Sequence, residues 1–258
     1  MGCGHSSSQV SAEKEKPEEI KSDHMRVLIL VAHVDPTHKA TAFRFSESAK
    51  QALLDAGHEV RYVNLVEDGF DHGITEKEFK KVEKDPFNFF ANTKSENLSD
   101  DTQKQQENLK WCTHVIIFAP MWFGRLPAAV YAYTERVITV PFAWDFDHPM
   151  EKGFLAGRKV TCILSLGSPP TSFDGSKGNG LDAYAWSALY AFNYCGFTIL
   201  RSFGIYGANS PNRIEEQPEL MRQLNEKIVK LDSWPVIENK KVQPLASLDQ
   251  LTVDNIIQ

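Results

Sequence analysis

Several common features are missing from this 258-residue sequence, and each absence excludes a class of protein. No stretch of about eighteen uncharged apolar residues is present to span a bilayer as a helix. The net charge of -6 lacks the basic excess that phosphate backbones require, which argues against a general nucleic-acid role. The four cysteines form no C-x-x-C pair and no His/Cys metal spacing, so we expect a reducing intracellular compartment and no metal site.

The dinucleotide fingerprint G-x-G-x-x-G is also absent after the first predicted strand, and a different loop stands in its place. This loop is A-H-V-D-P-T-H-K-A-T at residues 32–41. The hydroxyl groups of Thr37 and Thr41, the charge of Lys39 and the free amides of the following helix are suited to binding an anion. His33, at the end of the strand, either points a ring N–H at that ligand or is an ordinary loop histidine.

A second candidate ligand site is the passage from a strand through an aromatic loop into a helix at residues 115–137. Residues 115–119 form an apolar, β-branched run typical of a central parallel strand covered on both faces. Pro120 ends the run, Gly124 permits close backbone approach, and Pro127 suits the first turn of a helix. Because ligands bind at the carboxyl ends of parallel strands, the loop predicts a seat for a flat ligand, with ordinary core packing as the alternative. The residues that would form this seat are Met121, Trp122 and Phe123.

Strand-like and helix-like patterns alternate along the chain from residue 25 onward. We expect strands at residues 26–32, 58–65, 114–119, 158–166 and 197–206. We expect helices at residues 40–56, 100–112, 127–140, 181–195 and 217–231. Five β-α units predict a three-layer α/β fold, and right-handed crossovers favour a five-stranded parallel sheet of order 2-1-3-4-5. Residues 66–100 form a long insertion without clear periodicity.

The sequence divides into three predicted parts. Residues 1–24 form a polar, flexible tether, residues 25–232 form the folded domain, and residues 233–258 form a tail that packs on the domain or on a partner. The first residues, M-G-C-G-H-S, match the myristoylation pattern at Gly2, and Cys3 offers a palmitoylation site.

A single acyl chain binds membranes only marginally, so stable anchoring needs a second signal. Residues 13–23 contain five acidic residues and three lysines, which is not a polybasic patch, so Cys3 must supply that signal. We therefore expect the protein to be tethered to the cytoplasmic face of a membrane. The alternative is a chance match in a disordered leader.

Further motifs follow in a fixed order along the chain. They are A-H at Ala32 and His33, K-D-P-x-N-F at residues 84–89, the loop from Pro120 to Pro127 and Ala128, F-A-W-D-F at 142–146, a degraded form of the glycine-rich loop G-S-x-x-G from Gly167, with Thr171 in the last position, and C-G-F at 195–197. In this order they resemble the DT-diaphorase branch of the flavodoxin-like NAD(P)H:quinone oxidoreductases, over about residues 25–231. The resemblance implies a flavodoxin-like homodimer with bound FAD that passes two electrons from NAD(P)H to a quinone in ping-pong order.

The resemblance also implies roles for particular residues. His33, Thr37 and Thr41 would contact the flavin phosphates, and residues 120–124 would cradle the ribityl chain and the ring. Trp144 and Phe146 would line the quinone pocket, either in the same chain or across the dimer. The amides of Gly167 and Ser168 would face the flavin N1 and C2 oxygen.

Three departures separate this chain from the family pattern. The loop at residues 32–41 is two residues longer than the family's and lacks its S-F-N. The family's catalytic Tyr and His have no clean equivalents, and Phe173 and Lys177 fall closest to them. The arginine on the adenine side of FAD has only Arg213 as a candidate, which leaves FMN as an alternative to FAD.

Three other functions are open at this point. One keeps the flavin and reduces an azo dye, a nitroaromatic or chromate. Another is a flavin-bearing regulatory subunit of a membrane transporter. A one-electron carrier is disfavoured, because the aromatic segment at residues 142–146 would then be unexplained.

Overall fold

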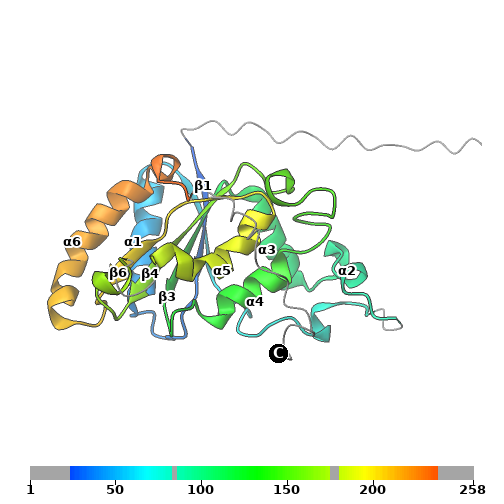
Figure 1. Ribbon diagram of the computed structural model, residues 1–258, viewed down its shortest axis with the longest axis horizontal. Helices are drawn as coiled ribbons and strands as arrows, with labels where there is room; N and C mark the ends of the chain where they lie inside the picture. The colour runs from blue at the N-terminus through cyan, green and yellow to red at the C-terminus, as the bar shows by residue number, and fades with distance from the viewer. Residues whose placement is uncertain (1–23, 83–85, 175–179, 238–258) are drawn as a thin grey trace, which may run out of the picture.

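The computed structural model describes residues 24–82, 86–174 and 180–237, which form a three-layer α/β fold (Figure 1). The strands are β1 (Arg26–Val31), β2 (Glu59–Asn64), β3 (His114–Pro120), β4 (Lys159–Leu166), β5 (Thr198–Ile199) and β6 (Phe203–Tyr206). The α-helices are α1 (Thr41–Asp55), α2 (Phe89–Asn92), α3 (Asp100–Trp111), α4 (Ala128–Val137), α5 (Leu181–Tyr194) and α6 (Pro211–Ile228). Single 3₁₀ turns lie at Glu76–Glu78, Ser95–Asn97, Met150–Lys152, Pro170–Ser172 and Leu231–Ser233.

The strands form one parallel sheet of order β2-β1-β3-β4-β5, which confirms the predicted topology. The predicted last strand is instead two short strands, β5 and β6, which pair with successive parts of β4. The backbone of Arg201 leaves the ladder between them. Its carbonyl accepts hydrogen bonds from Thr161 Oγ1 at 2.8 Å and Trp234 Nε1 at 2.9 Å, and its amide donates to Pro235 O at 2.8 Å. The tail therefore begins by packing on the domain.

The core lies on both faces of the sheet, because the central strands are apolar at every position. In β3 all seven residues are buried, and alternate side chains point to opposite faces. Val115, Ile117 and Ala119 pack beneath α4 and α5, whereas Ile116 and Phe118 pack beneath α1 and α6. The two helical layers lie on opposite sides of the sheet in Figure 1.

Three of the cysteines belong to this core. Cys112, Cys162 and Cys195 are buried and unpaired. Burial raises the pKa of the Cys112 and Cys195 thiols to about 12. Because the thiolate is the reactive form, these are inert core side chains.

Two helices differ from their predicted bounds: α4 ends three residues early, and α6 both begins and ends early. The helix α4 ends at Val137, where Gln106 Nε2 donates to the Val137 carbonyl at 3.2 Å and replaces a helical bond. The helix α6 begins at Pro211 rather than at residue 217. Proline suits the first helical turn because its missing N–H has no helical partner there, and α6 also accommodates Pro218 in its interior. The sequence interpretation missed this start.

A buried ion pair holds the insertion between β2 and α3 against α4. Arg136 Nε donates to Glu78 Oε2 at 2.5 Å, and the two side chains are 5% and 2% exposed. Arg136 Nη1 also donates to the Gly69 carbonyl at 2.6 Å, and the guanidinium lies over the Phe70 ring. Ser99 Oγ donates to the second carboxylate oxygen of Glu78 at 2.7 Å. The insertion is thus fixed at both ends.

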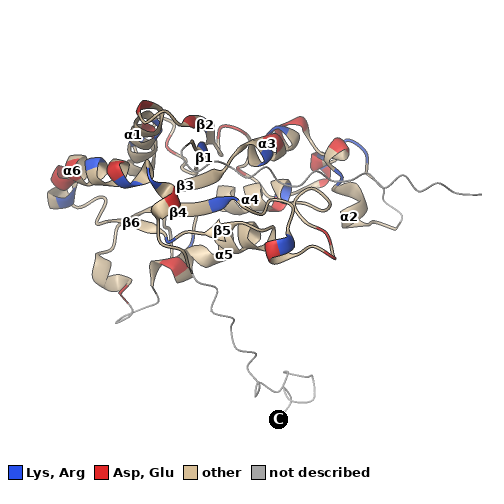
Figure 2. Cartoon of the chain, turned by 90° about the horizontal axis from the view of Figure 1, so that it is seen from above, with Lys and Arg blue, Asp and Glu red and all other residues tan. Residues whose placement is uncertain are grey.

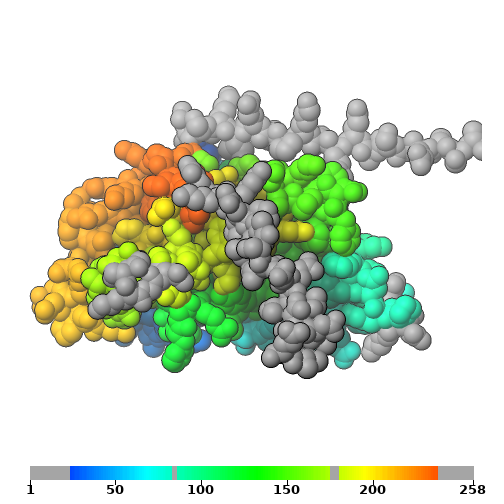
Figure 3. All heavy atoms as spheres, in the orientation of Figure 1, coloured from blue at the N-terminus to red at the C-terminus, as the bar shows by residue number. Residues whose placement is uncertain are grey.

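Charged residues of both signs are interspersed along α3 and α6 (Figure 2). The space-filling view places α6 at one end of the long axis and the insertion with α2 at the other (Figure 3). Among the described residues, no helix is both long enough and apolar enough to cross a membrane.

We predict that stability falls in acid because of His114. This side chain is 5% exposed, and its Nε2 lies 3.3 Å from Asp232 Oδ1. Burial lowers the pKa of His114 from 6.5 to about 4, and the nearby Asp232 carboxylate only partly opposes this. Protonation then favours the unfolded chain, so stability is complete above pH 6.5 and is lost as the pH falls towards 4, by about 3 kcal/mol.

Urea unfolding of the wild type and His114→Asn between pH 7 and pH 4 measures this effect. The variant should lose most of the slope in that window. His148→Gln is the matched control, because His148 is 49% exposed and pairs with Asp145 at the surface. An equal slope in the wild type and His114→Asn contradicts the prediction.

Candidate functional site

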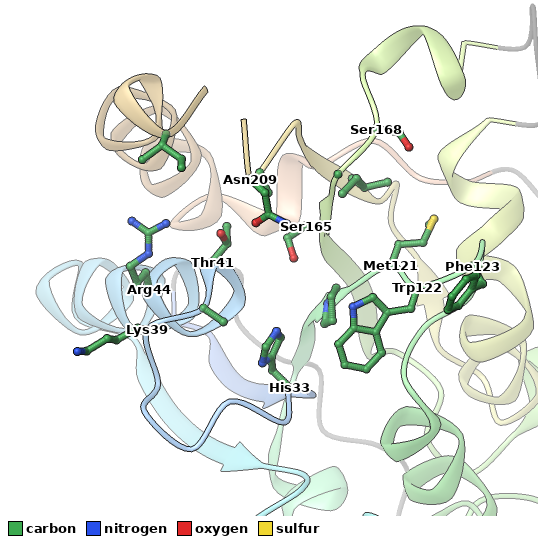
Figure 4. A pocket seen from close by; sticks show the side chains of 16 residues that line it. His33, Lys39, Thr41, Arg44, Met121, Trp122, Phe123, Ser165, Ser168 and Asn209 are labelled. Carbon is green, nitrogen blue, oxygen red and sulfur yellow. The ribbon is translucent and has the colours of Figure 1, made fainter. Parts of the chain in front are cut away.

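The carboxyl ends of β1, β3 and β4 open into one pocket of about 670 Å³ (Figure 4). The structure brings together nine residues that the sequence singled out: His33, Lys39, Thr41, Pro120, Met121, Trp122, Phe123, Gly167 and Ser168. The other lining residues were not predicted: Ala40, Arg44, Ser165, Leu166, Ala208, Asn209 and Ile214. A pocket of this size accommodates a cofactor or a small substrate.

The first wall of the pocket is the N terminus of α1. The amides of Thr41, Ala42 and Phe43 form no hydrogen bond to another backbone group of the described chain, as expected for a first helical turn. Arg44 brings positive charge to this wall and is held by a hydrogen bond to Gln217 Oε1. Thr41 faces the pocket in Figure 4, while Lys39 extends away from its centre. This wall is suited to an anionic group.

His33 lies at the floor of the pocket, between two aromatic rings. Its ring centroid is 5.9 Å from that of Phe43 and 5.7 Å from that of Trp122. The Asp35 amide donates to His33 Nδ1 at 3.0 Å, so in the neutral ring the proton is on Nε2. Burial lowers the pKa of His33, although the charge of Asp35 opposes this shift. Burial therefore favours the neutral ring, which can donate its Nε2–H to a ligand in the pocket that His33 lines.

The second wall is a tight hairpin formed by residues 122–125. The amide of Trp122 donates to the Arg125 carbonyl at 2.9 Å, and the amide of Arg125 returns a bond to Trp122 at 3.0 Å. The two central residues, Phe123 and Gly124, have φ values of 52° and 72°. Glycine adopts this backbone readily, but phenylalanine does so only under strain. The strained turn leaves Phe123 fully exposed on the rim and Trp122 41% exposed.

The third wall follows β4. The amides of Gly167 and Ser168 form no hydrogen bond within the described residues. The carbonyls on either side are used, because Leu166 O accepts from Ala208 at 2.8 Å and Ser168 O accepts from Gly207 at 3.1 Å. These bonds fix the backbone while both amides stay available to a ligand.

A family model for the flavodoxin-like fold matches residues 25–228. The chain belongs to the flavodoxin-like family. This match covers the whole sheet and all the helices that form the pocket walls.

Relatives with described activities share the same region. NAD(P)H dehydrogenase (quinone) 1 of Cavia porcellus is 29% identical over 192 residues, which is 70% of this chain and 68% of that protein. Ribosyldihydronicotinamide dehydrogenase (quinone) of Mus musculus is 25% identical over 192 residues, 70% of this chain and 82% of the relative. These relatives confirm the resemblance to the quinone oxidoreductase branch.

Solved structures agree on the fold. A protein of Klebsiella pneumoniae described as a quinone reductase aligns with a TM-score of 0.73 at 21% identity, over 83% of this chain and 87% of the other. The FMN-dependent NADH-azoreductase of Bacillus anthracis, solved with FMN, aligns with a TM-score of 0.53 at 15% identity, over 80% and 99% of the two chains.

Among the described residues, six predicted site residues of this flavodoxin-like protein do not line the pocket, and two of them lie near it. Thr37 bonds through its amide and its hydroxyl to Asp35, at 2.9 and 2.7 Å. Gly124 turns the hairpin beside Tyr184, where a Cβ in its place would lie 3.4 Å from the tyrosine ring. Both therefore shape the site rather than line it.

The remaining four, Phe173, Arg213, Trp144 and Phe146, lie farther along the chain. Arg213 lines a separate cavity of about 160 Å³ and pairs with Glu216 at 2.6 Å. Phe173 packs against Tyr184 and Tyr206, with ring centroids 5.4 and 5.8 Å away.

Trp144 and Phe146 belong to a row of surface rings. Trp144 contacts Tyr194 at 4.8 Å between centroids, and Phe146 contacts Phe90 at 5.4 Å. Neither lines the pocket of its own chain. Lys177, Gly2, Cys3, Lys84 and Asp85 lie outside the described residues.

Two of the pocket residues that were not predicted could have been recognised in the sequence. Arg44 lies three residues after Thr41 in a predicted helix, so the helical period places both on one face. Ser165 is a polar residue that interrupts the apolar end of a strand, after Cys162, Ile163 and Leu164, just before Gly167. Asn209 lies between the last strand and α6, and only the fold brings it opposite α1.

Proposed function

We propose that this protein is a flavin-dependent NAD(P)H:quinone oxidoreductase. The observation that carries the proposal is the composition of the pocket between β1 and β3, the point where the strand order reverses. Free helix amides and Arg44 suit a phosphate on one wall, and Trp122 offers a flat apolar ring on the other. A flavin bound there would accept a hydride from NAD(P)H and pass two electrons to a quinone.

The chain's own residues would then bind and orient the cofactor. Thr41 and the first amides of α1 would hold the phosphate, with Arg44 adding charge. His33 would donate its Nε2–H to the phosphate or to a ribityl oxygen. The free amides of Gly167 and Ser168 would donate to the ring and stabilise negative charge on its pyrimidine edge.

The pocket favours FMN over FAD as the resident flavin. Arg213, which was the candidate for the adenine side, pairs with Glu216 and lines a separate cavity. The residues that do line the pocket would serve the phosphate, the ribityl chain and the ring. Acid release of the cofactor followed by chromatography would identify it, and FAD is the outcome that would contradict this assignment.

The first test of the function is the colour of the protein purified from cells. We expect visible flavin absorbance, bleaching by NADH or NADPH, and return of colour on addition of a quinone. Steady-state rates with a panel of quinones, azo dyes, nitroaromatics and chromate would then rank the acceptors. A protein that stays colourless with added FMN and FAD contradicts the proposal, and a coloured protein with feeble turnover favours a regulatory subunit.

We also propose a homodimer, in which Trp144 and Phe146 of one copy reach the pocket of the other. Phe146 is 71% exposed and its neighbour in the ring row, Phe90, is 44% exposed, so this surface is free in a single chain. Light scattering should give twice the chain mass. Phe146→Ser should weaken the dimer and raise KM for the quinone together; a monomeric, fully active wild type contradicts the idea.

The tether at residues 1–24 is a further part of the proposal, supported by the acylation pattern at Gly2 and Cys3. It would hold the domain at a membrane, where lipophilic quinones dissolve. Labelling of cells with a myristate analogue should mark the wild type and not Gly2→Ala. Cys3→Ser should keep the label but shift the protein from the membrane to the soluble fraction.

We predict that Phe123 contributes to substrate binding and does not stabilise the fold. Phe123→Gly removes a fully exposed ring and relieves a backbone strain at φ 52°, so the free energy of unfolding should stay unchanged or rise by up to about 1 kcal/mol. The value of kcat/KM for NAD(P)H or the quinone should fall about tenfold with the loss of one stacking face. Thermal unfolding and steady-state kinetics measure the two effects. A variant that is less stable and equally active would contradict the prediction.

A further inference from the structure

We propose that Asp35 is a positioning residue, an internal anion that pre-organises the loop between β1 and α1 for the flavin. The inference rests on the proposed function, because that function supplies the ligand, a flavin. The hydrogen bonds within the loop do not depend on it. Asp35 belongs to the stretch that is two residues longer than the family pattern, and the resemblance assigns it no role.

The Asp35 carboxylate occupies a nest of backbone amides. Oδ1 accepts from the amide and the hydroxyl of Thr37, at 2.9 and 2.7 Å. Oδ2 accepts from the amides of Lys39 and Ala40, at 2.9 and 2.8 Å. The Thr37 hydroxyl, followed by these amides, holds the pKa of Asp35 well below its usual range. Four donors therefore converge on a permanently charged group.

This arrangement decides which amides remain for a ligand. The amides of Thr37, Lys39 and Ala40 are used inside the protein, whereas those of Thr41, Ala42 and Phe43 are not. The helix has no side-chain cap at Ala40, and the Asp35 carboxylate accepts from the Ala40 amide, just before the first helical residue, so it leaves the amides of the first turn free. A phosphate is thereby directed to the first turn of α1, beside Thr41 and Arg44.

The same residue sets the hydrogen-bonding state of His33. The turn that the carboxylate closes places the Asp35 amide on His33 Nδ1 at 3.0 Å. This bond leaves the proton on Nε2, the nitrogen available to the pocket. Without the carboxylate the turn loses four bonds, and the amide is no longer held against the ring.

The test compares the wild type, Asp35→Asn and Asp35→Ala as full chains. FMN affinity, measured by quenching of flavin fluorescence, should fall about tenfold or more in Asp35→Ala and less in Asp35→Asn, which keeps one acceptor. Sodium formate should fill the vacated nest of Asp35→Ala and restore most of the affinity, compared with sodium chloride at equal ionic strength. Glu67→Gln is the matched control. Glu67 is an exposed carboxylate that bonds to His38 at 2.6 Å and to none of these amides. The FMN affinity of this variant should therefore change less than twofold.

Nitrogen-15 NMR gives readouts that do not depend on flavin. Formate should shift the amide signals of Thr37, Lys39 and Ala40 in Asp35→Ala and leave the wild type unchanged. The His33 ring should be the Nε2–H tautomer in the wild type and a mixture in Asp35→Ala. The proposal is overturned if Asp35→Asn or Asp35→Ala binds FMN as tightly as the wild type. It is also overturned if formate does not affect Asp35→Ala. If the wild type binds no flavin, the proposed function fails, while the formate and tautomer results still decide the role of Asp35.

Discussion

Replacing Arg136 with alanine should lower the free energy of unfolding by about 3–5 kcal/mol. The substitution leaves the carboxylate of Glu78, which is 2% exposed, without its cation in a buried site. It also removes the hydrogen bond to the Gly69 carbonyl and the contact with the Phe70 ring. Urea unfolding followed by circular dichroism measures the loss. The insertion should become protease-sensitive before the rest of the domain, because this ion pair fixes it on α4.

The double variant Arg136→Met with Glu78→Met is the informative control. It removes both charges and fills the space with apolar atoms, so it should regain most of the stability lost in Arg136→Ala. Lys50→Ala is the surface comparison, since Lys50 pairs with Glu47 in solvent, and it should cost less than about 1 kcal/mol. A loss below about 1 kcal/mol in Arg136→Ala would show that the pair does not hold the insertion.

Thr41→Glu should weaken FMN binding about 100-fold, the largest functional effect we expect. The new carboxylate stands at the first turn of α1, where the phosphate would bind, and two like charges in one site repel. An acidic residue at a helix N terminus stabilises the helix, so the variant should fold normally. Fluorescence titration with FMN measures the effect.

Riboflavin, which lacks the phosphate, makes this prediction specific. Its affinity should change little in Thr41→Glu, so the preference for FMN over riboflavin should collapse. Thr41→Val removes only the hydroxyl group and should weaken FMN about fivefold. Equal losses for FMN and riboflavin in Thr41→Glu would place the phosphate elsewhere.

The local patterns were sufficient for most of the architecture. The apolar, β-branched run in β3 required burial on both faces, and a strand buried on both faces in an alternating β-α chain required a parallel sheet. The turn-forming residues Pro120, Gly124 and Pro127 correctly predicted a loop at the carboxyl edge of that sheet. These features depend on neighbours along the chain, which is why the sequence alone predicts them.

The predictions that differ from the structure depend on contacts between distant segments. The single strand expected at residues 197–206 is divided because Thr161 and Trp234 take the carbonyl of Arg201 out of the ladder. Thr37 was expected to contact a ligand, but in the structure it bonds to Asp35, because the long loop folds back upon itself. No pattern of residue types reveals which internal acceptor a loop amide finds.

The sequence by itself determined the fold class, the order of the strands and the candidate ligand loops at 32–41 and 120–124. Hydrophobic period, turn residues and chain direction are enough for these, because they act over a few residues at a time. Only the tertiary structure decided that Arg44, Ser165 and Asn209 meet in the same pocket and that Trp144 and Phe146 do not line it. The physical reason is that a pocket is a set of side chains from separate strand ends, and their distances are set by the packing of the whole sheet between its helices.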